Sequence, residues 1–388
     1  MTIHCGFIPG GRRAARTIAL AVATLAAAGT SRAQAPAAPV AKPAETPRFT
    51  LGATIFTDFT YQRAPEVMGS DGKPLRKSEF EVRRAYVNLT GAAPTLFSFR
   101  ITPDVAARQS TTASGSGLPS DFRVGNSLDG SLTVRLKYAY AQVSFDTLGP
   151  RGKGAWIRLG QQQTPYIDFI DGIYRYRFQG PHFAERQGLL SSSDVGVSGH
   201  FNLPREYGDV HVGLYNGETY SRAEVNGQKA FQARASLRPF PKHTPARGLR
   251  LHGFYDHDSP LAGGVRERVI AGATFEHRHV NLGFDCVRAR DRSSALSAAA
   301  VRSAGCSAWL NPRLTGGLEG LVRYDHFTPN RAVAASKTEL IVGVAYWVPV
   351  LKAPQAAAVV ADYDAIDFDS ALGRPDERRF ELKALLTF

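Results

Sequence analysis

The sequence predicts an all-β fold: a single antiparallel barrel of about 16 strands that spans a membrane, with its third extracellular loop folded inward. Three observations favour this fold. Apolar and polar side chains alternate from Phe49 onward, long and short connections follow one another in turn, and the N-terminus has the features of an export signal. A barrel shows lipid only one face of each strand, so it needs no long apolar segment.

The N-terminal segment has the three parts of a secretory signal peptide. Basic residues lead into a short apolar stretch at 17–28, and Ser31-Arg32-Ala33 places small residues at the cleavage positions. We therefore expect a signal peptide at 1–33, an Ala/Pro-rich periplasmic leader at 34–48 and the barrel at 49–388. The alternative is a helix that stays on the mature protein. The signal predicts export, here to the outer membrane.

Alternation with a period of two recurs in segments of about ten residues, the length that a tilted strand needs to cross a bilayer. Val195 and Val197, for example, oppose Asp194 and Ser198. The expected strands are 49–61, 79–91, 94–104, 132–146, 154–163, 193–203, 208–216, 229–239, 248–257, 267–277, 279–289, 303–311, 314–326, 337–349, 355–366 and 379–388.

The connections after odd-numbered strands are long, and most of those after even-numbered strands are short. One end of a membrane barrel has tight turns and the other has loops, whereas a soluble sandwich has no reason to sort its connections in this way. The long connections are 62–78, 105–131, 164–192, 217–228, 258–266, 290–302, 327–336 and 367–378.

The last expected strand is apolar at every second position and ends on Phe388. An aromatic residue at this place is similar to the signal read by the barrel-assembly machinery, which we expect as a partner. The alternative is an ordinary edge strand. Further aromatic residues near strand ends are expected in the interfacial girdles of the barrel. They are Tyr61, Phe145, Trp156, Tyr255, Tyr324 and Trp347.

The net charge of +13 indicates an anionic partner. Four arginines leave with the signal, which still leaves +9 on the mature chain. An exported protein meets little nucleic acid, so the partners that we expect are outer-membrane lipid with its lipopolysaccharide, and small anionic solutes in a pore. The alternative is a basic balance that only keeps the loops solvated.

Arginines recur on the polar phase of the expected strands. A charge that faces lipid at the bilayer midplane costs roughly 2–4 kcal/mol, so these arginines are expected to face a water-filled lumen. Rings of Arg or Lys favour the passage of anions. The pore-lining candidates on strands are Arg84, Arg100, Arg158, Arg234, Arg250 and Arg323. For each of them, a solvated wall position without a binding role is the alternative.

The connection 164–192 is long for a simple surface loop, and its many aromatic side chains would lack cover in open water. We expect it to fold into the lumen and to form the constriction. Arg175, Arg177 and Arg186 complete the set of pore-lining candidates, because a guanidinium binds phosphate or carboxylate through paired hydrogen bonds. The alternative is that these arginines pair with the carboxylates of the same loop and only fix it.

Cys286 and Cys306 fall on the outward phase of consecutive strands, equally far from the middle of their connection. Cysteines that face each other in an oxidising compartment pair, so we expect a cross-strand disulfide.

We expect no metal site and no cofactor, since no ligand spacing or nucleotide-binding loop is present in the sequence. Ser198 and His200 are the nearest candidates for an enzymatic pair, but they lack an obvious orienting partner. No catalytic residue is assigned.

Several short motifs follow the order and spacing of a known family. They are Glu81-Val-Arg83-Arg84-Ala85-Tyr86-Val-Asn-Leu-Thr-Gly91, Phe97-Ser-Phe99, Tyr138-Ala-Tyr140-Ala, Arg158-Leu-Gly160-Gln161, Thr164-Pro165-Tyr166, Phe183-Ala-Glu185-Arg186 and Asp194-Val-Gly196-Val. Over 79–237 the chain resembles the phosphate-selective porin O/P family. The resemblance implies a sixteen-stranded, usually trimeric porin with an arginine-lined path and a lysine-containing constriction. Where many relatives have a lysine after the Gly-Gln of the fifth strand, this chain has Gln163.

These observations predict a passive outer-membrane porin for small hydrophilic solutes, with a preference for anions, phosphate among them. The sequence leaves the identity of the solute open. A closed structural or adhesin-like barrel is the first alternative, and an outer-membrane barrel enzyme is the second.

Overall fold

The structure is a computed structural model that describes residues 48–388 apart from 94–95, 108–131, 150–151, 223, 225, 261–262, 293–298, 334 and 352–354. The predicted signal peptide at 1–33 and leader at 34–48 lie outside the described residues, except for Arg48, where the first strand begins. Among the described residues, no helix is long and apolar enough to cross a membrane.

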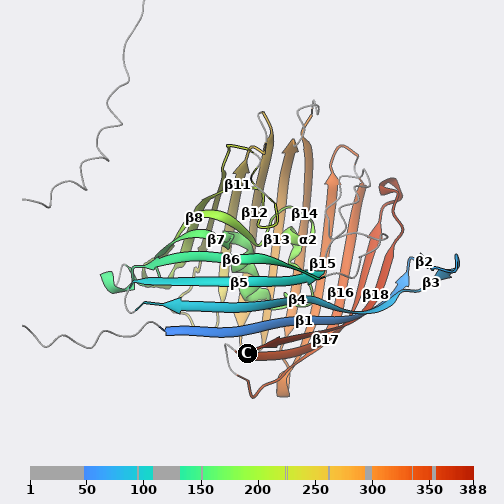
Figure 1. Ribbon diagram of the computed structural model, residues 1–388, viewed down its shortest axis with the longest axis horizontal. Helices are drawn as coiled ribbons and strands as arrows, with labels where there is room; N and C mark the ends of the chain where they lie inside the picture. Colours follow the sequence, from blue (N-terminus) through green and yellow to red (C-terminus); the bar gives the residue numbers. More distant parts are fainter. Residues whose placement is uncertain are drawn as a thin grey trace, which may run out of the picture. The chain divides into compact units, whose positions relative to one another are not determined.

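Sixteen antiparallel strands close into one barrel, as predicted (Figure 1). Each strand pairs with the next in the chain, and β18 closes the ring by pairing with β1, with Thr54 opposite Thr387. The strands are β1 (Arg48–Ala64), β4 (Ser78–Ala92), β5 (Phe97–Ala107), β6 (Leu132–Ser144), β7 (Trp156–Gln163), β8 (Ser193–Asn202), β9 (Gly208–Tyr215), β10 (Ala230–Leu237), β11 (Leu249–Asp258), β12 (Val265–His277), β13 (Val280–Arg292), β14 (Val301–Pro312), β15 (Leu318–Asn330), β16 (Ala335–Trp347), β17 (Ala356–Phe368) and β18 (Glu377–Thr387).

The remaining elements are short. The strands β2 (Val67–Met68) and β3 (Pro74–Leu75) form a small hairpin in the first long connection. The helices α1 (Pro165–Tyr174) and α2 (Phe183–Arg186) lie in the connection between β7 and β8. Single 3-10 turns at Asp146–Leu148, Pro204–Glu206, Thr315–Gly317 and Ser370–Leu372 shape four other connections.

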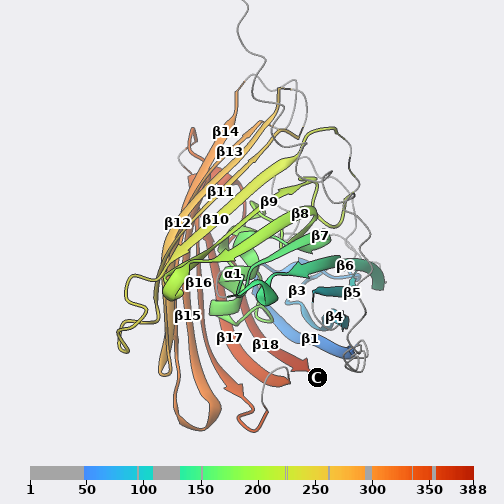
Figure 2. The same cartoon turned by 90° about the vertical axis from the view of Figure 1, so that its left-hand side faces the viewer.

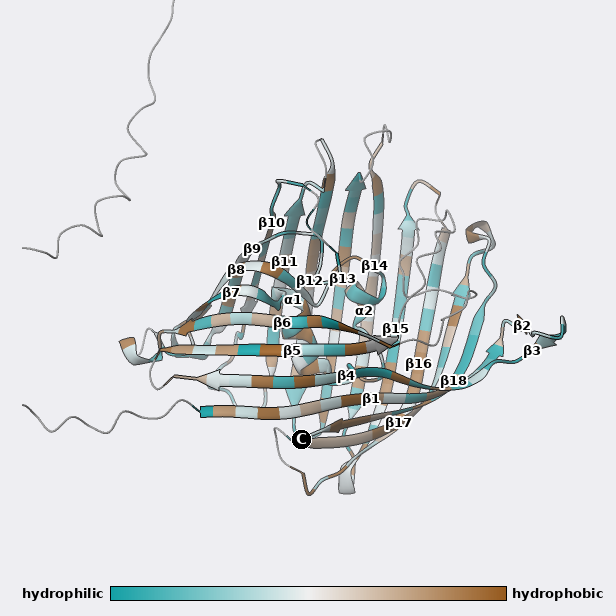
Figure 3. Cartoon of the chain, in the orientation of Figure 1, coloured by the Kyte–Doolittle hydropathy of each residue, from teal (hydrophilic) through white to brown (hydrophobic). Residues whose placement is uncertain are grey.

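The two faces of each strand differ in polarity, and this difference explains why the sheet closes (Figure 3). On β13, Leu282 and Phe284 point outward and are exposed, whereas Asn281 and Asp285 point into the barrel and are buried. An apolar exterior suits lipid, and a polar interior can hold water and charged side chains. Closure also removes the unpaired strand edges that an open sheet would present.

Strand ends differ from the prediction in the second half of the barrel. The strands β12, β13 and β17 are longer than predicted, and β15 and β16 have the predicted 13 residues but begin and end at other positions. These strands extend into segments that we predicted as loops, so the connection 331–334 is much shorter than the expected 327–336. The connections 145–155 and 238–248 are longer than the 147–153 and 240–247 that the predicted strand ends imply.

Cys286 and Cys306 lie opposite each other in the register of β13 and β14, on the outward face. A disulfide joins their sulfur atoms in the structure. The bond links two neighbouring strands that the backbone ladder already pairs, so its position is compatible with the barrel.

The expected aromatic girdle was wrong for two residues. Trp156 and Trp347 have the lumen phase of β7 and β16 rather than the outward phase. The ring of Trp156 stacks on His200 at 5.3 Å between centroids, and the Nε1 of Trp347 donates a hydrogen bond to the hydroxyl of Tyr176 at 3.3 Å. Both tryptophans are the terminal residues of their strands. Their position near a strand end therefore did not predict whether their side chains face lipid or the lumen.

Candidate functional site

The connection 164–192 folds into the barrel and lies between its walls, as Figures 1 and 2 show. Its first part forms α1 because Thr164 stays extended before the helix and Pro165 occupies the first turn, where a missing N–H costs nothing. Arg175 ends the helix in a left-handed conformation, with a φ of 68°. We call residues 164–192 the constriction loop.

Aromatic side chains of the constriction loop form the apolar core of the barrel. The ring of Tyr166 packs against Phe254 at 5.4 Å, and that of Tyr174 packs edge-on against Trp309 at 5.2 Å. Both tyrosines are fully buried. The loop is therefore held by burial of apolar surface against β11 and β14, and these aromatics have the cover that the sequence required.

The wall also holds the backbone of the constriction loop, because charged and polar side chains donate hydrogen bonds to its carbonyl oxygens. The donors and acceptors are Arg234 to Pro165 (3.1 Å), Asn281 to Ile173 (2.9 Å), Lys383 to Gln179, Arg323 to Pro181 (2.9 Å) and Arg268 to Leu189 (3.0 Å). These bonds reach the loop from β10, β12, β13, β15 and β18, so it is fixed along most of its length.

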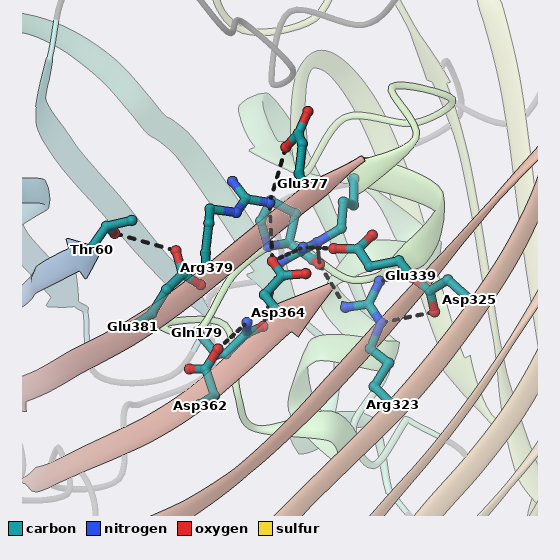
Figure 4. A network of polar contacts seen from close by, with 12 residues as sticks. Thr60, Gln179, Arg323, Asp325, Glu339, Asp362, Asp364, Glu377, Arg379 and Glu381 are labelled. Atoms are coloured by element: carbon teal, nitrogen blue, oxygen red, sulfur yellow. Dashed lines mark hydrogen bonds and ion pairs between the residues drawn. The ribbon is translucent and has the colours of Figure 1, made fainter. Parts of the chain in front are cut away.

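A third set of contacts joins arginines of the loop to carboxylates of β15–β17. Figure 4 shows part of this region, where Glu339, Asp364 and Arg379 lie near one another. Arg175 pairs with Glu319 at 3.1 Å. Arg186 pairs with Glu339, and with Asp364 at 3.4 Å. We define the acidic wall as the lumen-facing charged residues of β15–β18. It comprises Glu319, Arg323, Asp325, Lys337, Glu339, Asp362, Asp364, Glu377, Arg379, Glu381 and Lys383, with a net charge of −3.

Two predicted pore-lining arginines are buried in this region. Arg323 is fully buried and forms a salt bridge with Asp325 at 2.5 Å, beneath the constriction loop. Arg186 is 8% exposed. Burial also lowers the pKa of His182 in the same loop well below its ordinary value, and Arg323 adds to the effect, so the contact of His182 with Asp285 at 3.5 Å involves a neutral imidazole.

Another part of the lumen wall, separated from the acidic wall by β1 and β4, has the reverse charge. We define the basic wall as the charged residues of β5–β7, which are Arg100, Asp104, Arg135, Lys137 and Arg158. All five have contacts on the lumen side, and their net charge is +3. The two walls therefore differ in sign, and anything that passes the constriction loop crosses the potential between them.

A β-bulge places Lys137 on the basic wall. Thr102 is opposite Tyr138 and Pro103 is opposite Leu136, so Lys137 is one extra residue in β6. Strict alternation with Tyr138 and Tyr140 would point Lys137 at lipid, where a charge is costly. The bulge changes the phase of the strand, and Lys137 lies buried in the lumen with its ammonium donating to the hydroxyl of Ser192.

A second β-bulge changes the phase of β4. Phe56 is opposite Arg84 and Thr57 is opposite Val82, so Arg83 is the extra residue. Arg83 and Arg84 consequently both face the lumen, where Arg83 pairs with Asp58 at 2.7 Å and Arg84 pairs with Asp104 at 2.8 Å. The alternation rule found Arg84 and missed both Arg83 and Lys137.

Arg100 and Arg158 rest on a shelf of aromatic rings. The guanidinium carbon of Arg158 lies 3.8 Å from the ring centroid of Trp156 and 4.7 Å from that of Tyr140. Arg100 lies 4.5 Å above the ring of Tyr138. Stacking of this kind orients a guanidinium without neutralising it.

Their hydrogen bonds are with neutral acceptors only. Arg100 donates to Thr102 at 3.0 Å and to Asn88 at 2.8 Å. Arg158 donates to Gln142 at 2.7 Å and to Gln163 at 3.2 Å. Across the described ranges of the chain, neither arginine forms an ion pair with a carboxylate. Beside Arg100, a cavity of about 350 Å³ is lined by Tyr140, Gln142 and the hydroxyls of three other residues, Thr50, Thr90 and Ser98.

Tyr220, from the connection after β9, lies against two cations of the basic wall. Its ring centroid lies 4.1 Å from the ammonium of Lys137 and 4.9 Å from the guanidinium carbon of Arg135. Asp104 accepts from Arg135 at 3.0 Å as well as from Arg84. Among the described residues it is the one carboxylate within ion-pair distance of this wall, and Asp168 of the constriction loop adds a longer-range attraction to Arg158 and Arg100.

The other candidates from the sequence have carboxylate partners. Arg177 pairs with Glu185 and, at 3.3 Å, with Asp171, all within the constriction loop. Arg234 is 4% exposed and pairs with Asp209. Arg250 pairs with Glu276 at 2.9 Å, at the end of the barrel that has the short 278–279 turn.

The structure also separates the residues of the enzyme alternative. His200 contacts Asp209 at 3.1 Å, whereas Ser198 contacts the Nε2 of a different histidine, His211, at 3.1 Å. Ser198 itself donates to Gln162 at 2.5 Å. No group of three or more His, Cys, Asp or Glu side chains with metal-binding geometry occurs in the part of the chain that the structure describes.

Comparison with solved structures identifies the architecture. An anion-selective porin from Comamonas acidovorans has a TM-score of 0.59 to this chain at 11% sequence identity, covering 88% of this chain and 100% of that one. The outer membrane channel DcaP of Acinetobacter baumannii has a TM-score of 0.54 at 14% identity, covering 88% and 97%. The chain has the porin fold.

A third similar solved structure is OmpT, an outer membrane protein of Vibrio cholerae in a trimer form, with a TM-score of 0.53 at 12% identity over 89% of this chain and 100% of that one. The likeness is one of fold, since the identities are 11–14%. No family model and no curated protein sequence matches the chain. The resemblance to the phosphate-selective porin O/P family stays a prediction.

Proposed function

We propose that this chain is exported, inserted in the outer membrane and forms a pore through which small hydrophilic solutes diffuse passively, with anions preferred. The observation that supports the preference is the basic wall, on which Arg100, Lys137 and Arg158 form no ion pair with any described carboxylate. A passing anion gains from such unneutralised cations, and a cation is repelled by them.

The geometry also supports passage rather than turnover. Ser198 and His200, the nearest candidates of the enzyme alternative, have different partners, and the arginines of the basic wall are held by aromatic rings and neutral acceptors that leave their charge available. A guanidinium can bind phosphate or carboxylate through two parallel hydrogen bonds. We therefore propose small anions as the solutes, and phosphate is one to test because of the family resemblance.

A trimeric assembly and cleavage after Ala33 belong to the same proposal. The trimer form of the OmpT structure supports the first, and the small residues at 31 and 33 support the second. Mass spectrometry of the protein extracted from membranes measures the N-terminus, and its migration as an oligomer in mild detergent measures the assembly.

Planar-bilayer recording tests the function. Purified mature protein should conduct, and its reversal potential in a KCl gradient should report chloride as more permeant than potassium. The triple substitution Arg100→Gln, Lys137→Gln and Arg158→Gln should lower that permeability ratio roughly tenfold, because the three cations together shift the free energy of an anion relative to a cation by about 1.4 kcal/mol.

Arg247→Gln is the matched control. Arg247 is an exposed arginine in the turn 238–248 and pairs with Glu206 at 2.7 Å, outside the lumen, so its loss should leave the ratio unchanged. A preference for potassium would refute the anion proposal. A folded barrel that inserts and does not conduct would favour the closed structural alternative instead.

A further inference from the structure

The outward face of β13 and β14 changes from apolar to basic toward the long connection 293–300. On β13 the outward residues Leu282 and Phe284 are followed by Cys286, Arg288 and Arg290. On β14, read in the same direction, Leu310 and Ala308 are followed by Cys306, Ala304 and Arg302. We call Arg288, Arg290 and Arg302 the outer arginine patch.

The three arginines are exposed, and two of them face each other, because Arg290 and Arg302 are directly paired in the register. Like charges at facing positions destabilise a sheet. A fourth arginine, Arg331, is brought beside Arg302 by a hydrogen bond from its N–H to the carbonyl of Arg302 at 2.8 Å. The arrangement concentrates positive charge on one small area of the exterior.

No carboxylate neutralises the patch. Across the ranges that the structure describes, none of the three arginines forms an ion pair. Glu267 on β12 is opposite Arg290 in the register, but its carboxylate accepts a hydrogen bond from the hydroxyl of Tyr255 at 3.4 Å and lies beyond ion-pair distance of Arg290. The patch is therefore complementary to an external anion.

The position of the patch selects the kind of anion. Charges on the outward face are costly at the bilayer midplane and nearly free at its boundary, so the patch marks the level at which the apolar belt ends. Arg288 is two residues beyond Cys286, about 7 Å along the strand. Tyr255 lies in the same row of paired residues, where an interfacial aromatic is expected.

The disulfide lies between the apolar belt and the patch. Cys286 and Cys306 are each four residues from one member of the facing pair Arg290 and Arg302. The bond therefore ties the two strands together at the level where they begin to present arginines. A fixed register keeps the guanidinium groups at a constant spacing, as a site for a multiply charged head group requires.

We infer that the outer arginine patch binds the phosphate groups of an anionic lipid in the outer leaflet. The acyl chains of this lipid would lie along Leu282, Phe284, Ala308 and Leu310, and its phosphates would accept hydrogen bonds from the arginines. The inference rests on the membrane location that we propose, but it requires no channel activity.

Lipid binding to the detergent-solubilised barrel tests the inference. The dissociation constant of phosphorylated lipopolysaccharide is measured for the wild type and for the variant Arg288→Gln, Arg290→Gln and Arg302→Gln. Near a membrane surface each arginine contributes about fivefold to the binding of anionic lipid, so the variant should bind on the order of 100-fold more weakly. Dephosphorylated lipopolysaccharide should bind the wild type as weakly as the variant binds the phosphorylated form.

The control variant Arg205→Gln, Arg247→Gln and Arg278→Gln removes the same charge from exposed residues at the short-turn end, and it should bind like the wild type. Replacement of the patch by three lysines should keep most of the affinity, which separates a loss of charge from a loss of folding. Wild-type affinity in the glutamine variant would overturn the inference. Displacement of the lipid by inorganic phosphate would overturn it too, because the patch would then be a site for soluble anions.

Conductance separates this inference from the proposed function. The outer arginine patch faces away from the lumen, so its glutamine variant should conduct with wild-type selectivity. A barrel that binds lipid and does not conduct would refute the pore and leave the lipid site standing.

Discussion

The two charged walls of the lumen use similar side chains for different purposes. The acidic wall on β15–β18 has seven carboxylates and four cations, and its net charge is −3. The basic wall on β5–β7 has four cations and one carboxylate, and its net charge is +3. The acidic wall receives Arg175 and Arg186 from the constriction loop, whereas the basic wall receives no ion-paired cation or carboxylate from it among the described residues.

The comparison shows that lumen arginines differ in whether a carboxylate neutralises them. Arg323 and Arg158 are both lumen-phase arginines, yet Arg323 is fully buried against Asp325 and Arg158 meets neutral acceptors and aromatic rings. A buried pair neutralises itself and positions the loop. A guanidinium that lies beside water without a carboxylate partner still attracts anions and repels cations. We therefore propose that the acidic wall mainly stabilises the constriction loop and that the basic wall mainly acts on passing solutes.

The largest effect is expected from Arg186→Ala. Loss of this guanidinium leaves Glu339 buried without its cation, whereas Asp364 keeps Arg379 at 3.1 Å, and breaking a buried ion pair from one side costs roughly 3–5 kcal/mol. The constriction loop should detach from the acidic wall. Urea titration of the barrel in detergent measures the stability loss, and single-channel recording should show a larger, noisier conductance.

Arg158→Ala is the matched comparison on the other wall. It removes an arginine that stacks on Trp156 and has no carboxylate partner among the described residues, so the loss of stability should be under about 1 kcal/mol. Its effect should be on the permeability ratio. Equal destabilisation by both variants would show that the two walls do not divide their tasks.

A smaller effect is expected from Asp104→Asn, which removes the one carboxylate of the basic wall. Asp104 is fully buried and accepts hydrogen bonds from Arg84 at 2.8 Å and Arg135 at 3.0 Å. The amide keeps one acceptor oxygen but neutralises neither guanidinium, so the wall gains one positive charge. The chloride-to-potassium permeability ratio should rise roughly threefold. Glu276→Gln, which removes the carboxylate partner of Arg250 at the end of the barrel, is the control and should change the ratio much less. An unchanged ratio in Asp104→Asn would contradict the proposal that the basic wall sets the anion preference.

The barrel itself was predictable because one physical constraint acts on every strand. Each crossing must offer lipid an apolar face, so period-two alternation located all sixteen strands, and the phase of Arg84, Arg100 and Arg158 followed from it. Strand ends were less predictable, because β12–β17 extend beyond the apolar belt, where alternation no longer has to be apolar. The outward Arg288 and Arg290 are an example.

The site was predictable only in part, because bulges break the alternation rule. Lys137 and Arg83 occupy positions that strict alternation would turn to lipid. A signal was present in the sequence: Arg135 and Lys137 share one parity while Tyr138 and Tyr140 share the other, and two charges cannot both face lipid. The division between paired and unpaired arginines depends on contacts between distant strands and the constriction loop, which a local pattern does not contain.

The smallest effect is expected from Gln163→Lys, which restores the lysine of the family that the sequence resembles. Gln163 is 7% exposed and accepts a hydrogen bond from Arg158 at 3.2 Å. A lysine there would replace that acceptor by a second cation, so repulsion from Arg158 should push the ammonium into the lumen. We expect the permeability ratio to rise only about 1.5-fold, since Lys137 and Arg158 already set the potential of this wall. Gln163→Met, of similar length and uncharged, is the control in the same reversal-potential measurement. A permeability ratio that rises well above that of Asp104→Asn would contradict this expectation. It would mean that the neutral side chain at Gln163 limits the anion selectivity of the pore.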